Sequence, residues 1–203
     1  MRAALRVAGV HVLLAGLAFG AVAVWGTGAD PARADLAVTV PDPDPRLPVN
    51  PELVALVRPP GLIVMDTTRE KHGAWLTSVL PAKEAEYLDD AGVVSVKALV
   101  SRDGEFSQGV WQLAVRDGAD PSAALRVADD LYAAGGWQEA PGQAGVLVRT
   151  HAPTPDLPLA AYRAHYVRGP YLIRVEAYGT DAERVRREFD ALADRQLARW
   201  PPK

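Results

Sequence analysis

Hydrophobic residues follow three different patterns along this chain, and the first is an unbroken apolar stretch. It covers residues 7–25, follows Arg2 and Arg6, and contains no charged side chain. A helix of this length is about 28 Å long, close to the ~30 Å hydrocarbon core of a bilayer, whereas the apolar part of a cleaved signal peptide is usually about 7–15 residues. The stretch therefore predicts a retained transmembrane helix. Because the positive residues precede it, we expect the N-terminus inside the cell and the rest of the chain outside.

A second reading of the same region stays open. Ala32, Arg33 and Ala34 form an A-x-A motif that signal peptidases accept, which allows cleavage after Ala34. Residues 1–34 are thus either a signal anchor or a signal peptide. The expected location is the cell membrane, as a single-pass protein with its C-terminal domain outside the cytoplasm. The alternative is secretion after signal cleavage.

The second pattern is a run rich in proline, which we assign to a linker over residues 35–60. Its seven prolines are Pro41, Pro43, Pro45, Pro48, Pro51, Pro59 and Pro60. Each proline fixes φ and removes a backbone donor, so neither a helix nor a sheet can continue through the run. The composition favours an extended polyproline II spacer. A proline-rich ligand for a recognition domain is the alternative.

The third pattern is the periodic alternation of a folded domain over residues 61–203. Short apolar or β-rich runs predict strands over 62–66, 93–100, 110–115 and 146–150. Helical spacing predicts a helix over 82–91, with Pro81 at its first position, and another over 122–134, capped by Asp120. A turn is expected at 102–104.

The clearest signal is a hairpin near the C-terminus. Apolar and polar residues alternate over 162–166 and again over 171–177, on either side of Gly169 and Pro170. Only a two-residue loop keeps the apolar residues of both strands on one face, because a slip of one residue moves every side chain across the sheet. This register places Arg163 opposite Glu176. Gly169 supplies the positive φ of a type II′ turn.

After the hairpin, Thr180 and Glu183 have the spacing of a capping box and predict a helix that runs to about Arg199. The fold class is therefore α+β: after the N-terminal transmembrane or signal helix comes a mainly antiparallel sheet with two or three helices packed on one face. Four tryptophans are expected in the core or between helices and sheet: Trp75, Trp111, Trp137 and Trp200.

The composition argues against several classes of function. The net charge of −3 gives no basic footprint for nucleic acid, and the lack of cysteine rules out disulfides and thiolate sites. The histidines outside the apolar stretch lack metal-ligand spacing, and no serine lies in a Gly-x-Ser-x-Gly elbow. We therefore predict no catalytic, cofactor-binding or metal-binding residue, and no cofactor. A dispersed catalytic triad stays open, since its members meet in space rather than in sequence.

One group of residues is a candidate binding face. The hairpin register places Arg163, His165, Arg174 and Glu176 on the same face of the sheet, which we expect to be exposed and opposite the helices. Two arginines suit an anionic ligand, and His165 is able to titrate. The alternative is a solvated face with one weak cross-strand ion pair.

The apolar stretch, the proline-rich linker, the segment LPAKEAEYL and the closing segment VRGPYLIRVEAYGTDAERVRREFDALADRQLARW together resemble a group of actinobacterial proteins. These are uncharacterised cell-envelope proteins, including lipoprotein-like and sensor-like extracytoplasmic domains such as those outside some receptor kinases. The resemblance covers about residues 76–200. This chain lacks the anchoring cysteine of the lipoproteins and the disulfides of the kinase-linked sensors, and no functional residue carries over.

These observations favour a non-enzymatic extracytoplasmic domain of the cell envelope, which binds a protein partner or a small ligand. The membrane is a further partner through residues 7–25 if they are retained. A hydrolase with a dispersed active site is one alternative. It requires a serine or aspartate beside His72, His151 or His165. A structural or accessory subunit of a membrane complex is the other.

Overall fold

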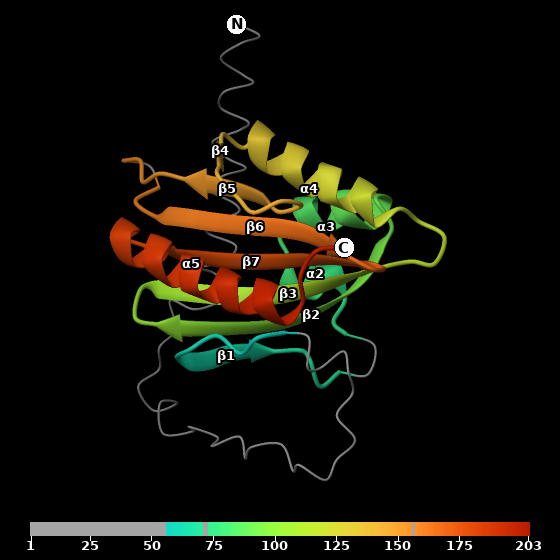
Figure 1. Ribbon diagram of the computed structural model, residues 1–203, viewed down its shortest axis with the longest axis horizontal. Helices are drawn as coiled ribbons and strands as arrows, with labels where there is room; N and C mark the ends of the chain where they lie inside the picture. Colours follow the sequence, from blue (N-terminus) through green and yellow to red (C-terminus); the bar gives the residue numbers. More distant parts are fainter. Residues whose placement is uncertain (1–55, 71–72, 156) are drawn as a thin grey trace, which may run out of the picture. The chain divides into compact units, whose positions relative to one another are not determined.

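The computed structural model describes residues 56–70, 73–155 and 157–203 of the chain. Within these residues all strands join one seven-stranded antiparallel sheet, in the order β1-β2-β3-β7-β6-β5-β4 (Figure 1). Its strands are β1 (Leu62–Asp66), β2 (Val93–Asp103), β3 (Phe106–Val115), β4 (Gln138–Ala140), β5 (Leu147–His151), β6 (Ala160–Arg168) and β7 (Tyr171–Gly179). The helices are α2 (Leu76–Val79), α3 (Ala82–Asp90), α4 (Pro121–Ala134) and α5 (Ala182–Arg199). The predicted α+β class, with an antiparallel sheet and packed helices, is confirmed.

The C-terminal hairpin has the predicted register. Arg163 lies opposite Glu176, and Arg168 lies opposite Tyr171 across the two-residue loop. Gly169 has a φ of 56°, as the first central position of a type II′ turn requires. Alternation fixed this register because each strand has a clear apolar face that the sheet buries.

The other central hairpin is longer than the sequence indicated. β2 ends at Asp103 and β3 begins at Phe106, so only two residues, 104 and 105, form the turn between them. Polar residues obscured this extension, because Ser101, Ser107 and Gln108 are buried in the paired strands. Ser101 Oγ and Gln108 Nε2 both donate to the carbonyl oxygen of Pro60, which allows two polar side chains to be buried there.

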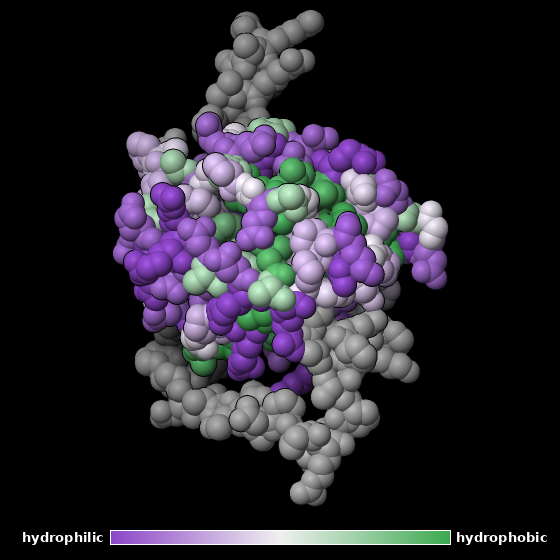
Figure 2. Space-filling view, viewed as in Figure 1, coloured by the Kyte–Doolittle hydropathy of each residue, from purple (hydrophilic) through white to green (hydrophobic). Residues whose placement is uncertain are grey.

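Helices cover both faces of the sheet, so the expectation that they pack on one face is wrong. The face that carries Val110, Val175 and Ile173 packs against α5, whereas the opposite face contacts α3 and α4. The hydrophobic cluster under α5 includes Val185, Phe189, Leu192 and Leu197 of that helix. The outer side of α5 is hydrophilic, and Figure 2 shows this surface from the viewpoint of Figure 1.

Two helix caps differ from the prediction. The N-cap of α5 is Asp181, whose carboxylate accepts a hydrogen bond from the backbone N–H of Arg184. Thr180 instead donates its hydroxyl to Glu105 in the β2–β3 turn, so the capping box does not form. Pro81 is the N-cap of α3 rather than its first helical residue. The predicted cap of α4 is confirmed, because Asp120 accepts from the N–H of Ser122.

The residues that lead into β1 pack on the α5 side of the sheet. Leu56 is buried in the hydrophobic cluster, and the N–H of Val57 donates to Oε1 of Gln196 at 2.8 Å. The apolar stretch 7–25, the cleavage position after Ala34 and residues 35–55 of the linker lie outside the described residues. In the described part of the chain, no helix combines the length and apolarity needed to cross a membrane.

Candidate functional site

The four predicted site residues lie on one face of the sheet, as expected from the register, but three of them are not exposed. His165, Arg174 and Glu176 are buried, with exposed fractions of 1%, 1% and 4%. The prediction that this face lies opposite the helices is wrong. The side chains are instead enclosed by α3 and α4, whose residues Glu84 and Tyr132 contact them.

Two neighbouring rows of side chains cross the central strands on this face. One row runs from Arg149 on β5 through Arg163 and Glu176 to Gly109 on β3. The next row runs through His165 and Arg174 to Trp111. Strand pairing therefore brings together all four residues of the predicted set, which are two arginines, one glutamate and one histidine, and α3 and α4 add a second glutamate and a tyrosine.

Arg174 is the centre of this buried network. Its Nε–H donates to Nε2 of His165 at 3.0 Å, and its Nη2 forms an ion pair with Oε1 of Glu84. The guanidinium also lies over the rings of Trp111 and Tyr132, with centroids at 5.8 and 5.9 Å. A buried arginine is tolerated only when its charge is paired and its donors are used, and Glu84 supplies the compensating charge.

Glu84 is the partner that allows Arg174 to be buried. Burial alone would raise the pKa of its carboxyl, but Arg174, Arg163 and hydrogen bonds from Tyr132 and Arg174 outweigh this effect and lower the pKa. The hydroxyl of Tyr132 donates to the same Oε1 at 2.6 Å, and burial raises the pKa of that phenol. Glu84 is therefore ionised and Tyr132 is protonated near neutral pH.

His165 is a neutral member of the network. Its Nε2 accepts a hydrogen bond, so that nitrogen holds no proton, and its ring stacks on Tyr132 with centroids 5.5 Å apart. Burial, then the positive charges of Arg174 and Arg163, lower its pKa well below the ordinary histidine value. The prediction that His165 titrates at an exposed surface does not fit this position.

Glu176 joins the network from the sheet. Its Oε1 accepts from Nε1 of Trp111 at 3.0 Å, and its Oε2 lies 2.9 Å from Nε of Arg163. Gly109 makes room for this contact: a Cβ at that position would lie 3.0 Å from Nε1 of Trp111 and 2.9 Å from Cγ2 of Val100. A side chain there would push the indole away from Glu176.

Arg163 is the one member of the predicted set that reaches the surface, with 18% of its side chain exposed. Its guanidinium lies over Tyr132 and Trp137, 4.7 and 5.0 Å from the ring centroids. Nε faces Glu176, but the guanidinium makes no well-aligned hydrogen bond to any described residue. Arginine carries five N–H donors, so most of those of Arg163 stay free of protein acceptors in the described structure.

The surface beside Arg163 is the part of this face that α3 and α4 leave partly open. Strand pairing places His151, Ala161, Tyr178 and Ser107 side by side across β5, β6, β7 and β3. Trp137 borders this row, with its ring 5.8 Å from that of His151. Nε1 of Trp137 and Nδ1 of His151 are buried atoms without a hydrogen-bond partner among the described residues. This is an unusual concentration of unused polar groups, since such groups are normally paired.

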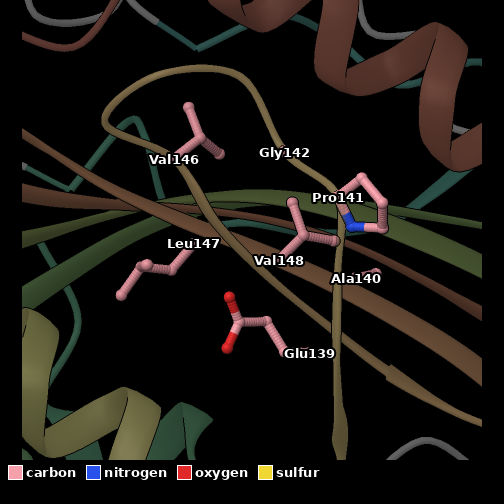
Figure 3. A pocket seen from close by; sticks show the side chains of 7 residues that line it. All are labelled: Glu139, Ala140, Pro141, Gly142, Val146, Leu147 and Val148. Atoms are coloured by element: carbon pink, nitrogen blue, oxygen red, sulfur yellow. The ribbon is translucent and has the colours of Figure 1, made fainter.

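Two clefts lie away from this network. One, of about 470 Å³, is an open cleft at the β4–β5 hairpin (Figure 3), and it is lined by Glu139, Ala140, Pro141, Gly142, Val146, Leu147 and Val148. The other, of about 300 Å³, lies between the β2–β3 turn and the start of α5. Glu139 is the one titratable side chain of the first cleft, and the carboxylates of the second are used by Thr180, Arg184 and the α5 cap. Neither cleft brings together an acid, a base and a nucleophile.

The described residues do not bring a catalytic pair together at the histidines. His165 is bonded to Arg174, and Nδ1 of His151 has no partner in the described structure. His72 lies outside the described residues. No group of three or more His, Cys, Asp or Glu residues in the described ranges has the geometry of a metal site. The hydrolase alternative therefore has no supporting geometry at His151 or His165.

Sequence reasoning missed Glu84 and Tyr132, although helical spacing held a signal for each. Glu84 shares the helix face of Ala85 and Leu88, which are both buried, so a carboxylate stands on the apolar face of a short helix. Such a residue needs a cationic partner. Tyr132 has helical spacing with the buried Ala124 and Ala128 of α4, but the sequence does not tell that its hydroxyl meets Glu84 of α3.

No family model and no curated protein matches the chain. Among solved structures, the chain is similar to the extracellular domain of PknH from Mycobacterium tuberculosis, with a TM-score of 0.33 and 13% sequence identity. The alignment covers 68% of this chain and 80% of the other. A likeness of this size implies neither a shared ligand nor a shared activity.

Proposed function

We propose that this chain is a non-catalytic binding domain of the cell envelope, and that it binds a small ligand with a carboxylate or phosphate group at Arg163. The apolar stretch 7–25 and the arginines before it support a place outside the cytoplasm. The binding proposal rests on one observation: Arg163 lies over two adjacent aromatic rings at the open edge of a buried ionic network, with 18% of its side chain exposed and N–H donors unused in the described structure.

Positioning is the first support for this site. Arg163 lies over Tyr132 and Trp137 and pairs with Glu176, so the guanidinium is held in place before any ligand arrives. A fixed arginine loses little side-chain entropy on binding, which favours affinity. Planar guanidinium groups recognise carboxylates and phosphates through two parallel hydrogen bonds.

The neighbouring groups favour an anion as well. Nε1 of Trp137 is a donor without a partner in the described structure, and a ligand oxygen would satisfy it. Beside Arg163, the sheet surface of the proposed site is formed by His151, Ala161, Tyr178 and Ser107, which combine polar and apolar side chains. A few polar groups set in an aromatic surround are typical of small-molecule sites.

The test is a titration of the full chain with two probes, inorganic phosphate and citrate, followed by calorimetry. We expect saturable binding that weakens at least about tenfold in Arg163→Gln, since each charge-assisted contact is worth about 1.5–3 kcal/mol. Arg186→Gln is the matched control, because Arg186 is an exposed arginine of α5 on the other side of the sheet. Equal binding by Arg163→Gln and wild type would mark an adventitious anion and overturn the proposal.

A second measurement keeps the test decisive if Arg163→Gln does not fold. The indole N–H resonance of Trp137 in the wild-type chain, assigned by its loss in Trp137→Phe, should shift with each probe at the same midpoint as the calorimetric titration. An unmoved resonance at saturating phosphate and citrate contradicts the site. A serine or aspartate-dependent hydrolysis of an ester probe would instead favour the enzyme alternative.

A further inference from the structure

The charges around Arg163 largely balance each other. The network holds two arginines and two glutamates, which are Arg163, Arg174, Glu84 and Glu176. Arg149, the next cation along the same row, donates from Nε and from Nη2 to Asp129, both at 2.7 Å. Arg163 can therefore bind one acid group with its unused donors, but the balanced charges around it add little attraction for further anionic groups. The site suits a ligand with a single acid group.

Two ring nitrogens beside Arg163 indicate what else the ligand carries. Nε1 of Trp137 and Nδ1 of His151 have no hydrogen-bond partner in the part of the chain that the structure describes, and the two rings are neighbours, 5.8 Å apart. An indole nitrogen only donates, whereas an imidazole nitrogen donates or accepts according to its tautomer. A hydroxyl group does both, so hydroxyls on one ligand can satisfy both nitrogens.

These nitrogens are within reach of a ligand at Arg163. The guanidinium lies over the Trp137 ring, and the His151 ring is next to that ring. Both nitrogens are covered, but the side chains of Trp137 and His151 are partly exposed. Side-chain rotation on binding is common, so a turn of either ring brings its nitrogen to the ligand. Pairing these atoms also removes the cost of leaving them without a hydrogen bond.

Tyr178 and Ser107 continue the same surface. They lie opposite each other on β7 and β3, and Tyr178 also pairs with Ala161, the neighbour of His151. The side chains of Tyr178 and Ser107 are hydrogen-bonded to each other, and Tyr178 is partly exposed. A tyrosine offers an apolar ring face and a polar hydroxyl. Such a surface fits a ligand ring with C–H groups on its faces and hydroxyls at its edge.

We propose that the ligand of the Arg163 site is a sugar acid, a ring with one carboxylate and several hydroxyls. This inference rests on the proposed function, in which Arg163 binds the acid group. Arg163 holds the carboxylate through two parallel hydrogen bonds, and Trp137 and His151 bind ring hydroxyls. Trp137 and His151 therefore determine the specificity of the site, because an acid without hydroxyls leaves their nitrogens unpaired.

The test compares two ring acids by calorimetry on the full chain. D-glucuronate and cyclohexanecarboxylate each have a six-membered ring with one carboxylate, but only D-glucuronate carries ring hydroxyls. We expect D-glucuronate to bind about tenfold or more tightly than cyclohexanecarboxylate, because the hydroxyls satisfy polar atoms that are otherwise buried without partners. Arg163→Gln should weaken the binding of both probes about tenfold or more, since both place a carboxylate on this residue.

Two variants test the residues that read the hydroxyls. Trp137→Phe and His151→Phe each remove a ring nitrogen and keep an aromatic ring, and in each the preference for D-glucuronate should fall to about threefold or less. Trp75→Phe is the matched control and should keep the full preference. Trp75 is 78% exposed and follows Ala74, which pairs with Val96 of β2, a strand that β3 and β7 separate from β6. The expectation that Trp75 lies in the core is therefore wrong.

A free sugar acid and the terminal residue of a glycan offer the same chemistry, and the methyl glycoside of D-glucuronate separates them. Binding within about threefold of that of the free acid assigns the terminal residue of a glycan. Binding weaker by about tenfold or more assigns the free acid.

Three results would overturn the inference. Equal affinity of the wild-type chain for the two ring acids, with both weakened in Arg163→Gln, overturns it and leaves the proposed function intact. Failure of both ring acids, phosphate and citrate to bind overturns the proposed function as well. A preference for D-glucuronate that survives in both Trp137→Phe and His151→Phe shows that the hydroxyls are recognised elsewhere.

A measurement on the wild-type chain decides the question if these variants do not fold. The imidazole NMR resonances of His151 should shift with D-glucuronate and stay unchanged with cyclohexanecarboxylate, because only the first probe carries hydroxyls for Nδ1. A shift with both probes, or with neither, contradicts the inference.

Discussion

The Nε–H of Arg174 donates a 3.0 Å hydrogen bond to Nε2 of His165, its direct neighbour across the β6–β7 hairpin. A cation that donates to an imidazole nitrogen requires that nitrogen to be unprotonated. The histidine is therefore held neutral by geometry as well as by burial. Several measurable consequences arise from this pair and from the residues around it.

The first prediction concerns pH. The pKa of His165 is lowered in the folded state, so between that value and the ordinary value of about 6.5 the unfolded chain binds more protons. The contribution of this group to stability should be constant above pH 7.5 and should decrease by about 1 kcal/mol between pH 7.5 and 5.5. His165→Gln should remove this decrease, measured by denaturant unfolding at each pH. His151→Gln is the control and should keep it. A histidine NMR titration with a midpoint near 6.5 for His165 would contradict the prediction.

The second prediction concerns the ion pair of Glu84 and Arg174. Glu84→Gln leaves a buried guanidinium without its counter-charge and should reduce the free energy of unfolding by about 3–5 kcal/mol. Glu84→Met combined with Arg174→Met removes both charges and should be less destabilised than either single variant. Glu86→Gln changes an exposed glutamate of the same helix and should have an effect below about 0.5 kcal/mol. Additive single effects would show that the two residues are not coupled.

The third prediction tests the close approach at Gly109. Gly109→Ala introduces a Cβ against Trp111 and Val100 and should reduce stability by about 1–3 kcal/mol. In the Trp111→Phe background the added methyl no longer meets an indole nitrogen, so the additional cost of Gly109→Ala should be smaller. Chemical denaturation of the four variants gives the coupling. Equal costs in both backgrounds would mean that Trp111 does not limit the size of this residue.

The fourth prediction separates the two candidate caps of α5. Asp181 accepts the N–H of Arg184, so Asp181→Ala should cost about 1 kcal/mol. Thr180 bonds Glu105 at an exposed position, and Thr180→Ala should cost less than about 0.5 kcal/mol. Thermal unfolding of both variants decides between them. The capping box predicts the reverse order of effects.

The hairpin register and the apolar faces of the helices could be predicted from the sequence, because alternation and helical spacing are local properties. The burial of Arg174 could not be predicted. That burial depends on Glu84, which lies 90 residues earlier and on a helix of another layer. Two arginines on one face of a hairpin are interpreted as solvent-exposed unless the helix that covers them is known, and that helix is placed by tertiary packing.

The prediction that the helices cover one face of the sheet was wrong for the same reason. α4 and α5 have similar apolar faces, and nothing local tells that they cover opposite sides of the sheet. The cap of α5 could not be predicted from local spacing either. Thr180 and Glu183 have the spacing of a capping box, but Glu105 accepts the hydroxyl of Thr180 and Asp181 accepts the backbone N–H of Arg184. Local signals of similar strength are decided by the tertiary environment.

The strand order has a consequence for the time at which the domain can form. β7 lies between β3 and β6, so the last strand to be made joins the two halves of the sheet. During synthesis from the N-terminus, β3 has no partner on its β7 side until residue 179 has emerged, and α5 follows still later. The centre of the sheet therefore forms late, and it depends on contacts between strands that are far apart in the sequence.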